Sequence, residues 1–279
     1  MAGPDAVDRF YRVVRGLARF WLWFLFKSVV VRHPERVPDH GPVLLCVNHP
    51  NNLIDSLVVG VAMRRKVHYM ATATLFRNRL LARFLRACGA IPVYRREEGP
   101  AGPVGVDRNV EAFAACHEAF AHGRMVAIYP EGTTHAEARV QRIRTGAARI
   151  ALGYEAERPG ALRMIPVGLS FQARKSFRGR VLIAFGEPIA PAAYVKAWRE
   201  DPVKAVDALT QDLQAAMELQ VVNVERIDDQ RLVGAVEELY RDELAVQVME
   251  SRGLADRDVD PVRLSRSIAD AVRHFKRAE

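Results

Sequence analysis

Cysteine is scarce in this chain, and its scarcity argues against two classes of protein. The three cysteines, Cys46, Cys88 and Cys116, are far apart, and none stands in a CxxC pair or at a metal-ligand spacing from a histidine. Neither a disulfide framework nor a cysteine-based metal site is therefore expected. Most histidines also occur singly, so the sequence predicts no metal. This composition fits a reducing compartment that faces the cytoplasm.

A long apolar run is also missing. The charge-free stretch FWLWFLF near the N-terminus has seven residues, and even when continued through Lys27 to Val31 it is shorter than the ~20 apolar residues that a membrane span needs. Five basic residues in segment 9–32 fall within an arc of about 120° on the expected helix: Arg9, Arg12, Arg15, Arg19 and Lys27. With Trp21 and Trp23 beside them, they predict an amphipathic helix lying in the membrane interface. The alternative is a helix packed on the protein's own core.

Acidic residues are absent from residues 64–96, which carry nine arginines and lysines, and the whole chain has a formal net charge of +8. One interpretation is a solvated basic face. The interpretation we favour is a surface for anionic lipid and for other phosphate groups. The sequence has no zinc-finger spacing, no RNP-like aromatic pattern and no basic recognition helix, so no nucleic-acid partner is expected.

The order of apolar and amphipathic segments predicts three regions. Residues 1–36 would form the membrane-associating helix. Residues 37–191 alternate short apolar runs with helix-length segments, which is typical of an α/β domain. Residues 192–279 carry long, highly charged amphipathic patterns and are expected to be helical. The helical pattern continues to the last residue, which is compatible with a longer protein.

Polar turns follow three of the expected strands: NHPNNLID, IPVYRR and YPEGTTH. In an open α/β sheet, ligands bind outside the carboxyl ends of the strands, so these turns could share one site. Each turn alone has an ordinary explanation. The two asparagines before LIDSLVVG, for example, are also a sound start for a helix.

Taken together and in this order, the blocks resemble those of the glycerolipid acyltransferase family, which acylates glycerol-3-phosphate and lysophosphatidic acid. The matching blocks are NHPNNLID, GAIPVYRR, YPEGTTH and MIPVGLSF, within residues 48–171, and FGEPI at 185–189 is also similar. The resemblance implies a mixed central sheet flanked by helices. It also implies acyl transfer at a membrane from acyl-CoA or acyl carrier protein, with no further cofactor.

One departure from the family pattern concerns spacing. The family commonly has four residues between the histidine and the aspartate of its first block, whereas five separate His49 from Asp55. On a continuous helix the extra residue would turn the aspartate by about 100° away from the histidine. We therefore expect a turn in which an asparagine adopts a positive φ, with the helix beginning near Leu53. This NHPNxLID form is similar to that of fungal-type glycerol-3-phosphate and dihydroxyacetone-phosphate acyltransferases.

Acyl transfer from a thioester needs a base for the acceptor hydroxyl, and an imidazole suits this role at neutral pH. His49 is the expected base, and Asp55 would fix its tautomer and stabilise the imidazolium. The sequence has no GxSxG, and Cys46 lies on an apolar run that predicts a buried strand, so direct transfer is expected rather than an acyl-enzyme.

The resemblance also implies a site for the acceptor phosphate. It assigns this role to Arg95, Glu131, Gly132 and Thr133, with Glu131 read as an orienting group rather than a direct ligand. The family often has a basic residue after Gly-Thr, but Thr134 and His135 follow here. Further candidates for the site are Asn48, Arg96, Arg142, Arg144 and Pro166.

Two other functions stay open. The first is a catalytically weak lipid-binding homologue, in which the longer spacing has separated His49 from Asp55. The second is a transacylase that moves chains between phospholipids with the same pair and no free donor. The distance between the two side chains distinguishes the first of these from an enzyme.

Overall fold

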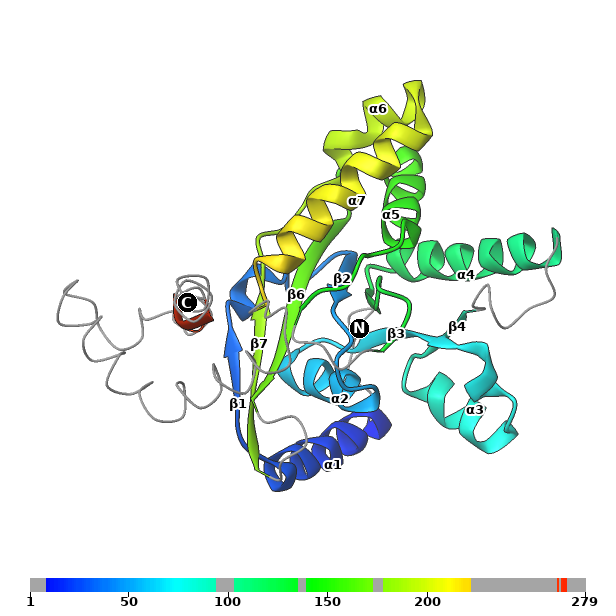
Figure 1. The fold of residues 1–279 in the computed structure, drawn as a ribbon. Coiled ribbons are helices and arrows are strands. Elements are labelled where there is room, and N and C mark those ends of the chain that lie inside the picture. The colour runs from blue at the N-terminus through cyan, green and yellow to red at the C-terminus, as the bar shows by residue number, and fades with distance from the viewer. Residues whose placement is uncertain are drawn as a thin grey trace.

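The computed structural model describes residues 9–93, 103–134, 139–172, 178–221, 265 and 267–269. In these residues a central sheet of seven strands runs in the order β1-β7-β6-β2-β5-β3-β4, with helices on both faces (Figure 1). The strands are β1 Phe26–Arg32, β2 Val43–Val47, β3 Val67–Thr72, β4 Ile91–Val93, β5 Met125–Ile128, β6 Arg163–Gln172 and β7 Gly179–Phe185. Every neighbouring pair is parallel except the antiparallel pair β6 and β7. The expected mixed α/β fold is therefore confirmed.

The helices form two layers, one on each face of the sheet. They are α1 Arg9–Leu25, α2 Leu53–Ala62, α3 Arg79–Ala87, α4 Pro103–Ala121, α5 Gly146–Glu157, α6 Val195–Glu200 and α7 Pro202–Glu218, with short 3₁₀ turns at Pro34–Arg36, Ala73–Phe76 and Pro191–Tyr194. Strand β2 shows why two layers are needed. Its alternate residues Val43, Leu45 and Val47 belong to the core under α1 and α2, whereas Leu44 and Cys46 belong to the core under α4, α5 and α7. A strand buried on both faces is apolar throughout, because successive side chains point to opposite sides.

The helices that follow Pro191 pack on the same core. Leu209, Leu213 and Met217 line one face of α7 and share a cluster with Ile150 and Leu152 of α5. This spacing of about four residues places them on one side of the helix. The segment up to Val221 is therefore packed onto the sheet, both through α5 and directly against β6.

The N-terminal segment differs from the single helix that the sequence predicted through Arg32. Helix α1 ends at Leu25, and the next seven residues form strand β1, which pairs in parallel with β7. The β-branched run at Val29–Val31 prefers an extended backbone, and the apolar edge of β7 provides the partner. Residues 26–32 are thus an integral part of the sheet.

Helix α1 is also fixed to α2 by one of its basic side chains. Tyr11, Ala18 and Leu22 are buried, and Arg15 donates hydrogen bonds to the carbonyls of Met63 and Arg64 at 3.0 and 3.1 Å. These carbonyls follow the C-terminal end of α2, where a cation is favourable. Arg15 therefore has a structural contact that the expected lipid-facing stripe did not include.

No helix in the described part of the chain is long and apolar enough to cross a bilayer.

Candidate active site

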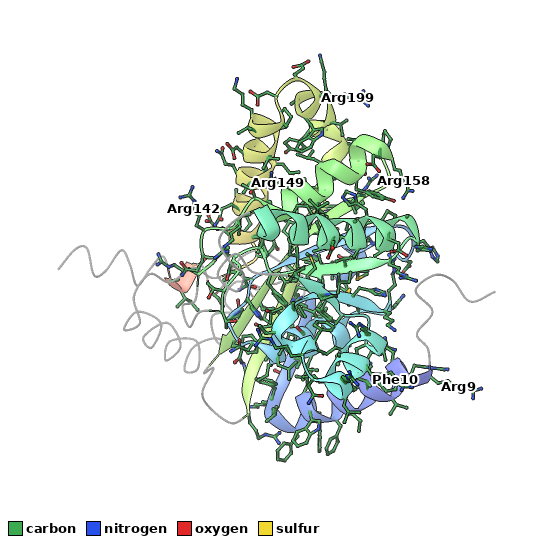
Figure 2. All side chains as sticks on the ribbon, turned by 90° about the vertical axis from the view of Figure 1, so that its right-hand side faces the viewer. Arg9, Phe10, Arg142, Arg149, Arg158 and Arg199 are labelled. Carbon is green, nitrogen blue, oxygen red and sulfur yellow. The ribbon has the colours of Figure 1, made fainter. Side chains whose placement is uncertain are left out.

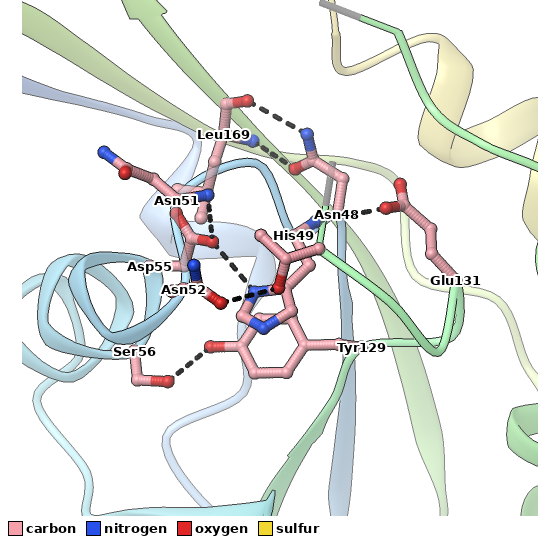
Figure 3. Close-up of polar contacts among 10 residues, drawn as sticks. Asn48, His49, Asn51, Asn52, Asp55, Ser56, Tyr129, Glu131 and Leu169 are labelled. Atoms are coloured by element: carbon pink, nitrogen blue, oxygen red, sulfur yellow. Dashed lines mark hydrogen bonds and ion pairs between the residues drawn. The ribbon is translucent and has the colours of Figure 1, made fainter. Parts of the chain in front are cut away.

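His49 lies in the turn after β2 and meets Asp55 in the first turn of α2. Nδ1 of His49 lies 2.8 Å from Oδ2 of Asp55 (Figure 3). Helix α2 begins at Leu53, as the sequence predicted, and the extra residue is absorbed at Asn52, whose φ is 51°. With its ψ of −125° this is a turn conformation that glycine adopts most readily and asparagine more readily than most other residues. The five-residue spacing therefore leaves the histidine and the aspartate in contact.

The side chain of Asp55 is held in place by two contacts at one of its oxygens. Its side chain is fully buried, and the oxygen that meets His49 also accepts the backbone N–H of Asn51 at 2.7 Å. The residue lies in the first turn of α2, where the helix dipole favours a negative charge. We place a proton on Nδ1 of His49, which donates it in the hydrogen bond to Asp55, because a carboxylate accepts hydrogen bonds. Nε2 is then the ring nitrogen that can take a proton from another molecule.

Glu131 holds the backbone of His49 in place. Its side chain is buried, and its two oxygens accept the backbone N–H groups of His49 at 3.4 Å and Gln141 at 3.3 Å. Within the candidate phosphate-binding set, Glu131 was expected to orient Arg95 or the acceptor hydroxyl. The contacts join the turn after β5 to the turn after β2, so Glu131 also helps to position the histidine.

Asn48 extends the pairing of β2 with β6 beyond its last residue. The side chain is buried, donates to the carbonyl of Leu169 at 3.0 Å and accepts from its N–H at 2.7 Å. An amide that bonds both groups of one residue imitates a neighbouring strand. Asn48 therefore fixes the point at which the chain leaves the sheet, immediately before His49.

Replacing Asn48 by alanine should lower the free energy of unfolding by roughly 2 to 4 kcal/mol, because the N–H and C=O of Leu169 would stay buried without this partner. Urea unfolding followed by circular dichroism measures the loss. Asn78→Ala is the matched control, since Asn78 caps the exposed N-terminus of α3 through Leu80 and Leu81 and should cost only about 1 kcal/mol. Equal losses for the two variants would contradict the assigned role of Asn48.

Tyr129 lies directly against the imidazole and was not singled out by the sequence analysis. The rings of His49 and Tyr129 are stacked, with centroids 3.9 Å apart and planes 20° from parallel (Figure 3). The phenol oxygen is 2.6 Å from Oγ of Ser56 in α2. The sequence feature that could have pointed to Tyr129 is an aromatic residue at the first position after β5, in the YPEG turn.

Among the candidate residues for phosphate binding, the structure places the cation Arg144 at the turn after β5. Gly132 has a φ of 73°, and a Cβ added there would lie 2.7 Å from Nε of Arg144. The positive φ favours glycine at this position, and the guanidinium of Arg144 lies close beside it. Thr133 is exposed beside it, and Thr134 donates a hydrogen bond to the side chain of Asn52 at 2.8 Å. The turns after β2 and β5 are therefore linked by side chains.

The other candidates are less closely tied to His49. Arg142 is exposed at the molecular surface (Figure 2), and Pro166 is buried within β6, where it pairs with Cys46. Arg95, Arg96 and His135 lie outside the described residues. In the ranges that the structure describes, no three or more histidines, cysteines or acidic residues cluster in a way that could hold a metal ion.

Comparison with known proteins decides the family. Residues 28–170, about half of the chain, match the Acyltransferase family. The chain belongs to this family. The resemblance inferred from the four sequence blocks is therefore confirmed at the level of the acyltransferases.

Individual acyltransferases are similar to this one over different lengths. A 1-acyl-sn-glycerol-3-phosphate acyltransferase of Bacillus subtilis is 27% identical over 193 residues, which cover 67% of this chain and 87% of that protein. Glycerol-3-phosphate O-acyltransferase 2 of Saccharomyces cerevisiae is 27% identical over 135 residues, covering 48% of this chain and 18% of the yeast protein. An uncharacterized acyltransferase of Schizosaccharomyces pombe is 21% identical, and the alignment covers 45% of its length. The chain thus spans less than half of either yeast relative.

A solved structure has a similar fold. The crystal structure of the 1-acyl-sn-glycerophosphate (LPA) acyltransferase, PlsC, from Thermotoga maritima has a TM-score of 0.50 and 19% sequence identity, over 73% of this chain and 79% of that one. At this identity the comparison supports the arrangement of sheet and helices.

Proposed function

We propose that this acyltransferase transfers a fatty acyl group from acyl-CoA or acyl carrier protein to a hydroxyl of 1-acylglycerol-3-phosphate or glycerol-3-phosphate. The observation that carries the proposal is the 2.8 Å contact between His49 and Asp55 at the carboxyl end of β2. A base oriented by a buried carboxylate suits the activation of an alcohol. The names of the bacterial and budding yeast relatives support the choice of acceptors.

In the proposed reaction, Nε2 of His49 removes the proton from the acceptor hydroxyl as its oxygen attacks the thioester carbonyl. Asp55 stabilises the imidazolium that forms, because its charge is held beside Nδ1. The tetrahedral intermediate then collapses, the carbon–sulfur bond breaks, and the imidazolium returns the proton to the departing thiolate. His49 is neutral again at the end of the cycle.

The cysteines near the sheet do not compete for the role of nucleophile. Cys46 and Cys116 are buried in the core under α4 and α5. Burial raises the pKa of Cys46, and it raises the pKa of Cys116 to about 12, so both thiols stay protonated and unreactive. This supports direct transfer without an acyl-enzyme.

The turn around Gly132 is the proposed site for the acceptor phosphate. A guanidinium and a main-chain turn that permits close approach are the groups that bind phosphate well, and Arg144 and Gly132 supply them. The hydroxyl of Thr133 lies exposed on the same turn. Arg95 keeps its proposed role from the family pattern.

The proposed membrane contact is the outer surface of α1 and α3. On α1, Phe20, Trp21, Trp23 and Phe24 are between 45% and 66% exposed. Phe10 at the other end of α1 (Figure 2) meets Phe84 of α3 edge to face at 5.9 Å. Several exposed apolar side chains that lie together on neighbouring helices are typical of a binding surface. The basic side chains of both helices favour anionic lipid, with the active site facing the cytoplasm.

Replacing Trp21 and Trp23 together by alanine should weaken binding to vesicles that contain anionic lipid by about tenfold or more. The substitution removes two indole rings that favour the membrane interface. Co-sedimentation with phosphatidylglycerol vesicles measures this. The matched control is Val203→Ala, since Val203 is 70% exposed on α7, away from α1. If the tryptophan variant binds as well as the control, α1 is not the contact surface.

The function itself is tested by supplying purified protein in lipid vesicles with labelled acyl-CoA or labelled acyl carrier protein, and each of the two acceptors in turn. Formation of lysophosphatidate or phosphatidate identifies the acceptor and supports the proposal. Labelled phospholipid as the only acyl source tests the transacylase. Vesicle binding without transfer from any donor would point to the lipid-binding homologue and overturn the enzymatic assignment.

A further inference from the structure

We propose that Tyr129 is a positioning residue for this reaction, whose ring holds the plane of the His49 imidazole and stabilises the positive charge that it gains. The inference rests on the proposed role of His49 as the base. It concerns how the base is held, and the family match assigns nothing to this side chain.

The first observation is the stacking itself. The ring of Tyr129 faces the imidazole, with centroids 3.9 Å apart and an angle of 20° between planes. An imidazole held by one hydrogen bond at Nδ1 can still tilt about that bond. A flat ring against one face removes this freedom, so Nε2 keeps a single direction. The Asp55 contact and the Tyr129 contact therefore constrain different motions of the same ring.

The second observation is that Tyr129 and Asp55 are fixed to the same helix. The hydroxyl of Tyr129 bonds to Oγ of Ser56 at 2.6 Å, and Ser56 follows Asp55 directly in α2. The backbone of His49 is held by Glu131, two residues after Tyr129. The turn after β5 thus contacts the histidine at its backbone and at its ring face, while α2 contacts it at Nδ1.

Proton transfer by the phenol is the competing role, and its surroundings argue against it. Burial raises the pKa of Tyr129 well above its usual range, and the nearby charge of Asp55 raises it further, although the hydrogen bond with Ser56 acts in the opposite direction. The phenol therefore keeps its proton at any working pH. The contribution of Tyr129 must come from its ring.

The ring has a physical means of acting on the transition state. The face of an aromatic ring carries negative electrostatic potential, so it attracts a cation that lies over it. The imidazole is neutral before the reaction and positive while it carries the proton of the acceptor. The stack is consequently stronger in the transition state than in the ground state, and such a contact raises kcat rather than substrate affinity.

The test compares Tyr129→Leu, which removes the ring, with Tyr129→Phe, which keeps it. We expect Tyr129→Leu to lower kcat about tenfold with the KM of donor and acceptor within twofold of wild type. Tyr129→Phe should restore kcat to within about threefold. Tyr129→Met, of similar volume and greater flexibility, replaces the leucine variant if that variant does not fold.

The control is Phe120→Leu, which removes another buried ring. Phe120 packs against Tyr154 at 5.2 Å, under α4 and α5, on the face of the sheet away from α2. The thermal unfolding temperature of the Phe120→Leu variant should fall as much as that of Tyr129→Leu, while its kcat stays at the wild-type value. Comparable kcat losses in the two variants would show that lost packing is the cause.

Three results with the Tyr129 variants themselves would also overturn the inference. These are full kcat in Tyr129→Leu, an equal loss of kcat in Tyr129→Phe, or a rise in KM with kcat unchanged. His49→Ala separates this inference from the proposed function. Activity that persists in His49→Ala defeats both, whereas an inactive His49→Ala variant beside a fully active Tyr129→Leu variant defeats the inference alone.

Discussion

His49→Ala should reduce kcat by about 10²- to 10⁴-fold, because the acceptor hydroxyl loses the group that removes its proton. KM for acceptor and donor should change little, since Asp55 and the turn around Gly132 stay in place. The variant should fold, because the ring is near the surface of the site, with its side chain 13% exposed. Initial rates with labelled acyl-CoA, taken over a range of acceptor concentrations, measure the effect.

The matched control for His49→Ala is His122→Ala. His122 is exposed directly after α4, and Nδ1 of its ring lies 2.8 Å from the carbonyl oxygen of Glu118 in that helix. It should keep the wild-type rate. A His49→Ala protein that turns over as fast as the control would remove His49 from the reaction and leave the transfer chemistry without a base.

Asp55→Asn should lower kcat by a comparable 10²- to 10⁴-fold, although the side chain keeps its size. An amide in this position can present its NH₂ group to Nδ1, which favours the tautomer with its proton on Nε2. That tautomer cannot accept the proton of the acceptor hydroxyl. The amide also has no charge with which to stabilise the imidazolium. The same rate assay, with thermal unfolding to verify the fold, measures both consequences.

Asp201→Asn is the control for the charge. Asp201 is an exposed carboxylate that accepts the N–H of Lys204 at the start of α7, and an asparagine caps a helix nearly as well. Its activity should equal that of wild type. Should Asp55→Asn retain more than about a tenth of wild-type kcat, the carboxylate would not be acting through His49.

The features that the sequence predicted are those with a local physical cause. Strand β2 follows from a continuous apolar run, and the start of α2 follows from the turn at Asn52, whose φ is positive and whose side chain makes no capping hydrogen bond. The His49–Asp55 pair could also be expected, because a turn was the one way to join the two across five residues. Each of these depends on neighbouring residues and on known backbone preferences.

The features that the sequence did not predict depend on partners far along the chain. Residues 26–32 were expected to continue a helix, and they form a strand because β7, some 150 residues later, offers an edge. Arg15 was counted with the lipid-facing stripe, but the end of α2 provides carbonyls for it. Tyr129 could be recognised only once the turn after β5 was found beside His49. Local patterns contain no information on such contacts.

The positive φ of Asn52 has a consequence for how relatives of this chain are recognised. The added residue occupies one turn position, and the two side chains still meet at 2.8 Å. A search string that demands four residues between histidine and aspartate would pass over this chain, although its geometry satisfies the same chemical requirement. The quantity that such searches should preserve is the distance between the imidazole and the carboxylate, and an insertion that a single asparagine can absorb leaves that distance unaltered.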